Sequence, residues 1–235
     1  MRELAVVVAK EPGTQPDTGD PGLRRTIRLD MRGQEEDSMR TVLCWTVLLA
    51  GALAVCGGHA LAAKVVLSPI AAVSISTHPT DGDKVTSASL PVGFDTDNTL
   101  YRGLMQFDLS GLPAGATITK ATLRLYQVGA KGVNLPVYVY RTNKSWDAAT
   151  VTWAGHAASF SPTAITSGGG GAANGTWVTY NVLILAKSWY STPGRNFGLM
   201  LRGSSEGGDW SFHRYASKDQ GDNPVHPRLV IEYTP

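Results

Sequence analysis

A regular alternation of apolar and polar side chains between residues 101 and 128 is the feature that most constrains how this chain can fold. From Tyr101 to Leu109 every second residue from position 103 is apolar or glycine, while Arg102, Gln106 and Asp108 stand between them. The alternation returns from Thr117 to Val128. Because successive side chains of a strand point to opposite faces, this period of two predicts two half-buried strands.

The rest of the second half of the chain continues in the same way, with short runs rich in Val, Thr, Leu and Tyr between turn residues. Many short strands of this kind are typical of antiparallel sheets. About nine strands predict an all-β fold, a jelly-roll-like antiparallel β-sandwich with one short helix. Further strands are expected at residues 135–141, 150–153, 177–180, 197–202, 210–213 and 228–233, a flexible loop at 154–175, and an opening strand, a loop and a second strand within 64–91.

The one helix is expected where the period changes. Val182, Leu185, Ala186 and Trp189 fall at positions i, i+3, i+4 and i+7, which is the spacing of one helical face. Asn181 stands where its side chain can cap the first turn. The helix should end before the Pro-Gly pair that follows and pack over one end of the sandwich.

An export signal is predicted inside the chain. Met39 and Arg40 precede the uncharged run 41–57, and small residues follow up to Ala62. A basic start, a short apolar segment and small residues at the end are the parts of a cleavable signal peptide. The run is short for a permanent span, which needs about 20 residues. The alternatives are a retained signal anchor and a lipoprotein modified at Cys56.

Three segments follow from that signal: residues 1–38, 39–62 and 63–235. The first is rich in mixed charges, Pro and Gly, which suits neither a leader nor a core, and we interpret it as a disordered upstream extension whose true start codon is Met39 or Met31. The second is the signal peptide. The third is long enough for one domain and contains the sandwich.

Charge and cysteine content narrow the class of protein. Residues 63–235 contain 14 Lys and Arg against 11 Asp and Glu, a mild basic excess that argues against a dedicated nucleic-acid binder. Both cysteines, Cys44 and Cys56, precede the domain, so it has no disulfide and no thiolate zinc site. The mild excess is compatible with an acidic polysaccharide as partner.

Several short motifs follow one another in a characteristic order and spacing. They are Arg102–Ile118, Ala121–Tyr126, Trp146–Asp147, Val151–Trp153, Trp177–Asn181 with Trp189, Asn196–Leu199 and Pro227–Ile231. Their order resembles the DNRLRE family, also classed as family 96 of carbohydrate-binding modules, which includes the repeats related to archaeal disaggregatase. The similarity spans roughly residues 87–234 and departs from the pattern at Asn181, where the family usually has Asp. It implies a β-sandwich module of secreted or cell-surface proteins, with acidic polysaccharides such as alginate as one type of ligand.

Candidate ligand contacts are cationic and aromatic. Arginine presents a planar fork that matches a carboxylate, and an indole can cover the apolar face of a pyranose ring. Ordinary solvated or salt-bridged strand residues are the alternative for the cations. Trp146 and Trp153 match framework positions and are expected to pack rather than to bind. The candidate carbohydrate contacts are Arg102, Arg202, Trp210, His213, Arg214 and Lys218, with Trp210 the aromatic side chain most readily placed on the surface.

A bound ion is the one cofactor that the sequence suggests. Asp95, Asp97 and Asn98, and separately Asp81 and Asp83, resemble oxygen-rich turns that can hold Ca²⁺, although plain turn chemistry explains them too. A structural Ca²⁺ is therefore one hypothesis for the first group.

No catalytic motif is convincing. Residues 203–207 spell G-x-S-x-G, but a hydrolase elbow needs a strand followed by a helix and an Asp and a His further on, whereas a hairpin is expected here. The sequence thus predicts a secreted, non-enzymatic carbohydrate-binding module for an acidic polysaccharide or cell-surface glycan. The alternative is a structural or adhesive surface protein that self-associates or binds another envelope component. Neither hypothesis includes nucleic acid, or a membrane span after signal cleavage.

Overall fold

The computed structural model describes residues 61–78, 84–85, 89–133, 135–208, 210–218 and 224–235. They form twelve strands, two α-helices and one 3-10 turn. The expected upstream extension, and the expected signal peptide apart from its last two residues, lie outside the described residues. The elements are β1 (Ala63–Leu67), β2 (Ala71–Ser76), β3 (Lys84–Val85), β4 (Ser89–Phe94), β5 (Leu100–Gln106), β6 (Thr117–Gly132), β7 (Val137–Arg141), α2 (Trp153–His156), β8 (Thr166–Gly168), β9 (Thr176–Asn181), α3 (Leu183–Ser191), η2 (Pro193–Arg195), β10 (Leu199–Gly203), β11 (Ser211–Ala216) and β12 (Arg228–Thr234).

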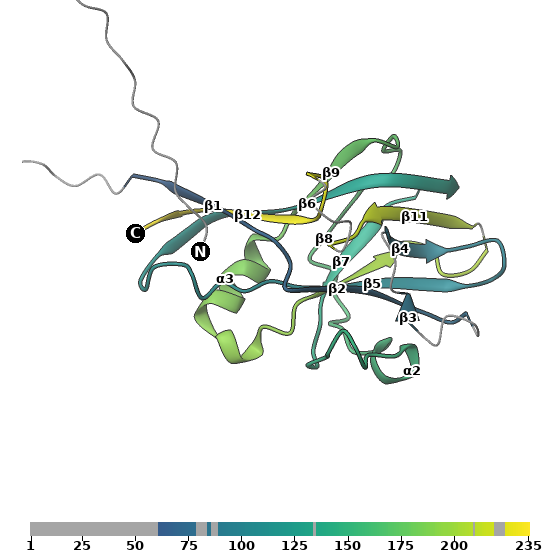
Figure 1. Ribbon diagram of the computed structural model, residues 1–235, viewed down its shortest axis with the longest axis horizontal. Coiled ribbons are helices and arrows are strands. Elements are labelled where there is room, and N and C mark those ends of the chain that lie inside the picture. The colour runs from purple at the N-terminus through teal and green to yellow at the C-terminus, as the bar shows by residue number, and fades with distance from the viewer. Residues whose placement is uncertain (1–60, 79–83, 86–88, 134, 209, 219–223) are drawn as a thin grey trace, which may run out of the picture. The chain divides into compact units, whose positions relative to one another are not determined.

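The strands are antiparallel and form one curled sheet in the order β1-β12-β6-β11-β4-β5-β10-β7-β8, with β9 on the free edge of β6 and β2 and β3 on that of β5. Strand β6 is long enough to pair with β12 in its first half and with β11 in its second. The sheet therefore folds into two layers, visible one above the other in Figure 1. We call β1, β12, β6 and β9 the β6 layer, and β3, β2, β5, β10, β7 and β8 the β5 layer. The predicted all-β sandwich is confirmed.

The main core lies between the two layers. Leu123 and Leu125 of β6 and Ile231 of β12 are buried against Met105 of β5 and Leu201 of β10. These are the inward positions that the alternation predicts for β5, β6 and β12.

Helix α3 closes one end of this core, with Leu185, Ala186 and Trp189 buried in it. The predicted helix is confirmed, but its first turn begins one residue later than expected: Val182 is the N-cap, and the Asn181 side chain accepts a hydrogen bond from the Leu183 amide (3.1 Å).

A second, smaller core lies on the outer side of the β5 layer. Val73, Leu104 and Met200 point outward there and are covered by the segment 142–161, which brings Trp153 and Phe160 onto the strands. This layer is consequently buried on both faces, which explains the unbroken buried runs in β2, β5 and β10.

Three sequence predictions were wrong in detail. The strand expected at residues 150–153 is a turn followed by α2, because Asp147 accepts the Ala149 amide and Thr152 caps the helix by accepting the Gly155 amide. The loop expected at 154–175 contains α2 and β8. Residues 65–75 form parts of two strands, since the chain leaves the β6 layer near Pro69 and enters the β5 layer.

Candidate functional site

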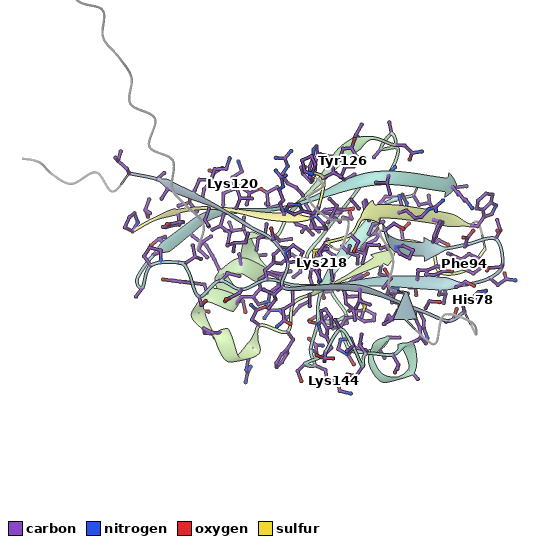
Figure 2. The ribbon with its side chains drawn as sticks, in the orientation of Figure 1. His78, Phe94, Lys120, Tyr126, Lys144 and Lys218 are labelled. Atoms are coloured by element: carbon purple, nitrogen blue, oxygen red, sulfur yellow. The ribbon has the colours of Figure 1, made fainter. Side chains whose placement is uncertain are left out.

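The outer side of the β6 layer presents a row of cations and aromatic rings. In the β-sheet register Arg228 of β12 lies opposite Arg124 of β6, and Trp177 of β9 lies opposite Tyr126. Lys120 stands four residues before Arg124 on the same strand. Figure 2 shows Lys120 and Tyr126 on the side of β6 that faces away from α3. We call these five side chains, Lys120, Arg124, Tyr126, Trp177 and Arg228, the basic face.

Two guanidinium groups of this face share one indole. The Arg124 Cζ atom lies 4.7 Å from the Trp177 ring centroid, and the Arg228 Cζ atom lies 5.5 Å from it. Tyr126 meets the same indole edge to face, with ring centroids 5.3 Å apart. A cation over an indole is attracted by the ring's quadrupole, so Trp177 holds two like charges close together.

Neither guanidinium has a carboxylate partner among the residues that the structure describes. Arg228 donates a hydrogen bond to the Pro224 carbonyl, and within the described part of the chain the interaction of the Arg124 side chain is its contact with Trp177. Like charges directly opposite each other on two strands destabilise the pair. An anion from solvent would relieve that repulsion.

Further polar groups extend the basic face along β6. Lys120 forms an exposed ion pair with Glu232 (3.3 Å) at one end. Thr122 and Thr179 lie on the same outer side and offer hydroxyl groups. Four residues of a strand span about 13 Å, so Lys120 and Arg124 can contact successive parts of an extended ligand. The arrangement is suited to a long, anionic, hydroxyl-rich chain.

The predicted contacts Arg102 and Arg202 lie elsewhere, on the outer side of the β5 layer, and they meet at Glu206. Arg102 Nε donates to Glu206 Oε1 (2.7 Å) and Arg102 Nη2 to Oε2 (2.5 Å), while Arg202 Nη2 lies 2.6 Å from Oε2. Side-chain exposure is 10% for Arg102, 31% for Arg202 and 11% for Glu206. The carboxylate is nearly buried between the two cations.

This ion triad fastens the covering segment to the β5 layer. Arg102 also donates to the Ala157 carbonyl and lies 4.9 Å from the Trp153 ring centroid. Burial alone would raise the pKa of Glu206, but hydrogen bonds from Arg102 and Arg202 outweigh it and hold that pKa below its ordinary value. The hydrogen bond to Glu206 likewise raises the pKa of Arg202. Arg102 is thus engaged inside the protein.

The predicted contact His213 lies inside the sandwich with no exposed surface. Its ring nitrogens lie within hydrogen-bonding distance of Gln127 Oε1 (3.3 Å) and Ser211 Oγ (3.5 Å), and its ring stacks on Tyr215. Burial lowers the pKa of His213, so it is neutral at neutral pH. A ligand at the surface of this fold does not reach it.

Three further predicted contacts are spread over the surface near β11. Trp210 is 39% exposed and is the one aromatic side chain among the large exposed apolar residues of the described chain, as predicted. Arg214 is exposed on the outer side of β11, beside Gly129 of β6. Lys218 follows the end of β11 and is half-buried. Of the six predicted residues, the structure brings only Arg102 and Arg202 together.

The framework tryptophans pack as predicted. Trp146 and Trp153 lie against the smaller core, and Trp146 Nε1 donates to the Phe197 carbonyl (2.8 Å).

The turn proposed for Ca²⁺ connects β4 and β5. Asp95 Oδ1 accepts the Thr96 amide (2.7 Å), Asp97 Oδ1 accepts the Thr99 amide (3.1 Å), and Asn98 has a φ of 63°. Those contacts are ordinary turn chemistry. Within the described residues no three His, Cys, Asp or Glu side chains gather as metal ligands. Asp81 and Asp83 lie outside the described residues, and a structural Ca²⁺ stays a prediction.

The G-x-S-x-G stretch forms a bend after β10. Ser205 Oγ donates to the Gly207 carbonyl (2.6 Å), and no helix follows it in the described residues. The geometry is that of a loop and differs from a nucleophile elbow.

Sequence reasoning missed the basic face as a site. Arg124, Trp177 and Arg228 are far apart in the chain, and only the strand order β12-β6-β9 brings them together. The available signal was an outward Arg or Trp in each of three predicted strands.

Comparison with known proteins identifies the class. The family described as carbohydrate-binding module family 96 matches residues 80–233, and the chain belongs to this family. Membership supports a carbohydrate-binding role.

One curated relative was also found, "Protein DVR-1 homolog" from Strongylocentrotus purpuratus. It is 32% identical over 121 residues, which is 50% of this chain and 24% of that protein. The chain therefore spans about a quarter of the length of that relative. Among the described residues, no helix is long and apolar enough to cross a membrane.

Proposed function

We propose that this protein is a non-catalytic carbohydrate-binding module that binds an acidic polysaccharide through the basic face. The observation that carries the proposal is the pair Arg124 and Arg228, which face each other across two strands with no carboxylate partner among the described residues. Guanidinium forks of this kind match the carboxylates of uronic acids or the sulfates of sulfated sugars.

The position of the pair also supports an extended ligand. A β-sheet face is open along its length, so a polymer can lie across Lys120, Arg124 and Arg228 in turn. Trp177 adds rigidity, because both guanidinium groups rest on its ring before any ligand arrives. Such preorganisation reduces the entropy lost on binding.

We further propose that the module acts outside the cell, as a secreted or cell-surface protein. Residues 39–62 have the charge and hydropathy pattern of a signal peptide. The family is one of binding modules, which supports a role in recognition rather than in a reaction.

The test is a titration of the protein with polygalacturonate, alginate and neutral dextran, by isothermal calorimetry, with and without Ca²⁺. We expect binding to the two polyuronates that weakens as sodium chloride rises from about 0.05 to about 0.5 M, because salt screens charge contacts. Replacing both arginines, Arg124→Gln with Arg228→Gln, should weaken binding at least about tenfold, since each charged hydrogen bond contributes about 1.5–3 kcal/mol.

Arg195→Gln is the matched control, because it removes the same charge from the exposed 3-10 turn η2 after α3. It should leave the affinity within about twofold of the wild type. Equal affinity for dextran and polyuronate, or an unchanged affinity in the double variant, would contradict the proposed site. The Ca²⁺ arm shows whether an ion is required.

A further inference from the structure

A hollow in the described part of the chain lies at the end of the β5 layer where β5 ends, beside α3. It has a volume of about 390 Å³ and is formed by the end of β5, the turn after it, and the end of α3. Volumes of this size are typical of sites for small molecules. No residue of the basic face lines it.

The floor of this pocket is apolar and closely packed. Phe107, Leu109 and Leu112 from the β5 end of the pocket and Trp189 from α3 are all buried. They belong to the main core and are held in place by it. Because these four side chains are almost fully buried, the apolar surface that a ligand can contact at this pocket is that of Ile70, which is 58% exposed and stands just before β2.

The rim of the pocket is polar and is fixed by hydrogen bonds within the protein. Asp108 Oδ1 accepts the Ser110 amide and Oδ2 accepts the Ser110 hydroxyl, both at 2.8 Å. Gln106 Nε2 donates to the Asn196 carbonyl (2.8 Å), and Asn196 Nδ2 donates to the Phe107 carbonyl (2.8 Å). Groups held in this way need little ordering when a ligand binds.

The hydrogen-bonding positions on the rim that have no partner among the described residues are acceptors. A carboxylate has about four lone-pair positions, and within the described chain the Asp108 carboxylate uses one on each oxygen. Gln106 Oε1 has no donor among the described residues. The two hydrogen bonds from Ser110 hold the pKa of Asp108 below its ordinary value, so it is ionised at neutral pH.

These features select the kind of ligand. Asp108 is the only charged residue that lines the pocket, so its negative charge disfavours a uronate and any other anion. An ionised carboxylate needs donors, and two neighbouring hydroxyl groups of a sugar supply them. The exposed Ile70 side chain, above the buried floor, can then meet the C–H face of the sugar ring.

From this geometry we infer a second carbohydrate site, a pocket that binds one neutral pyranose through hydrogen bonds from its vicinal hydroxyls to Asp108 and Gln106. The site is independent of the proposed basic face, and its ligand has the opposite charge preference. The protein would then hold an anionic chain on the β6 layer and a neutral sugar unit at the end of the β5 layer.

The experiment uses indole N–H signals of the ¹⁵N-labelled protein as local reporters. Trp189 lines the pocket and Trp177 belongs to the basic face, so the two signals distinguish the sites. Methyl glycosides of glucose, galactose and mannose are added first, followed in separate samples by galacturonic acid and methylammonium. We expect at least one neutral glycoside to shift the Trp189 signal and not the Trp177 signal.

Asp108→Asn is the test variant, because an amide oxygen can still accept the Ser110 amide while the charge is lost. It should weaken glycoside binding about tenfold, as expected when a charged acceptor is replaced by a neutral one. Asp147→Asn is the matched control, since Asp147 likewise accepts the amide two residues on (2.8 Å) and does not line the pocket. The control should bind as the wild type does.

Three results would overturn this site: no glycoside shifts the Trp189 signal, Asp108→Asn binds as tightly as Asp147→Asn, or methylammonium shifts the signal while glycosides do not. The last result would define a cation site instead. Loss of the arginines in Arg124→Gln with Arg228→Gln should leave glycoside binding unchanged, so the two sites can fail separately.

Discussion

The outer faces of the two layers carry similar side chains in different surroundings. On the β5 layer, Arg102 and Arg202 lie beside aromatic rings and share the carboxylate of Glu206. On the β6 layer, Arg124 and Arg228 lie on an indole and, within the described residues, share no carboxylate. Arginine beside an aromatic ring is thus no sign of a binding site by itself.

The difference between the two faces lies in what covers them. The segment 142–161 lies over the β5 layer and leaves the Arg102 side chain 10% exposed, whereas Arg202 keeps 31%. A guanidinium as buried as that of Arg102 requires a carboxylate partner. On the basic face Arg124 and Arg228 are half-buried, so they retain part of their hydration and can repel each other at modest cost. Of the two pairs, Arg124 and Arg228 are therefore the one available to bind an anion from solvent.

The largest expected effect on stability comes from removing the Glu206 carboxylate, which Arg102 and Arg202 share. Glu206→Gln should lower the free energy of unfolding by about 3 kcal/mol, because it leaves the buried Arg102 and the partly exposed Arg202 without a counter-charge. Urea denaturation measures it. Glu232→Gln, which breaks an exposed ion pair with Lys120, is the control and should cost less than about 0.5 kcal/mol. Equal losses in the two variants would show that Glu206 is not an internal partner.

The next largest effect distinguishes the roles of Trp177 and Trp153. Trp177→Leu should weaken polyuronate binding about tenfold with little change in stability, because the two guanidinium groups lose the ring that holds them. Trp153→Leu should do the reverse, since this ring packs against the smaller core and Arg102. Calorimetric titration and urea denaturation of both variants measure the contrast. A loss of affinity in Trp153→Leu at unchanged stability would reverse our assignment of the two faces.

Low pH should reduce the stability that Glu206 contributes on the outer side of the β5 layer. The pKa of Glu206 in the folded protein lies below the ordinary value of 4.5, so below that value the unfolded chain takes up a proton before the folded protein does. Stability from this carboxylate is therefore present above pH 4.5 and is lost as the pH falls through the lowered pKa. Urea midpoints between about pH 7 and pH 3 measure the loss, which should be smaller in Glu206→Gln. Parallel pH curves for the two proteins would contradict this account.

The smallest effect concerns the edge of the basic face. Glu232→Gln releases Lys120 from its exposed ion pair and should raise polyuronate affinity by about twofold, because one more cation is available to the polymer. Calorimetry at low salt measures it, and the gain should vanish at about 0.5 M sodium chloride. A lower affinity would place the ligand away from Lys120.

Several elements were predictable because their pattern is local. The alternation in β5, β6 and β12 reflects a sheet with a core on one side, and the spacing of Val182, Leu185, Ala186 and Trp189 reflects a helix over that core. The strand expected at 150–153 failed because side chains of Asp147 and Thr152 bind nearby amides and favour a turn and α2 over a strand.

The candidate contacts were less predictable, for a physical reason. The alternation of apolar and polar residues shows which side chains point away from the main core. It does not show whether another segment of the chain covers them. Arg102 and Arg124 both point away from that core, yet one meets Glu206 and the other faces solvent. His213 occupies an inward position, where Gln127 and Ser211 satisfy its ring.

The sequence by itself determined the class of fold, the main core and the family, because alternation, turn residues and motif order are properties of neighbouring residues. Only the tertiary structure decided which arginines are free to bind. Glu206 is 104 residues from Arg102, and Trp177 lies on a different strand from either of its arginines. Charge neutralisation depends on distances of a few ångströms between such residues, and the curl of the sheet sets those distances.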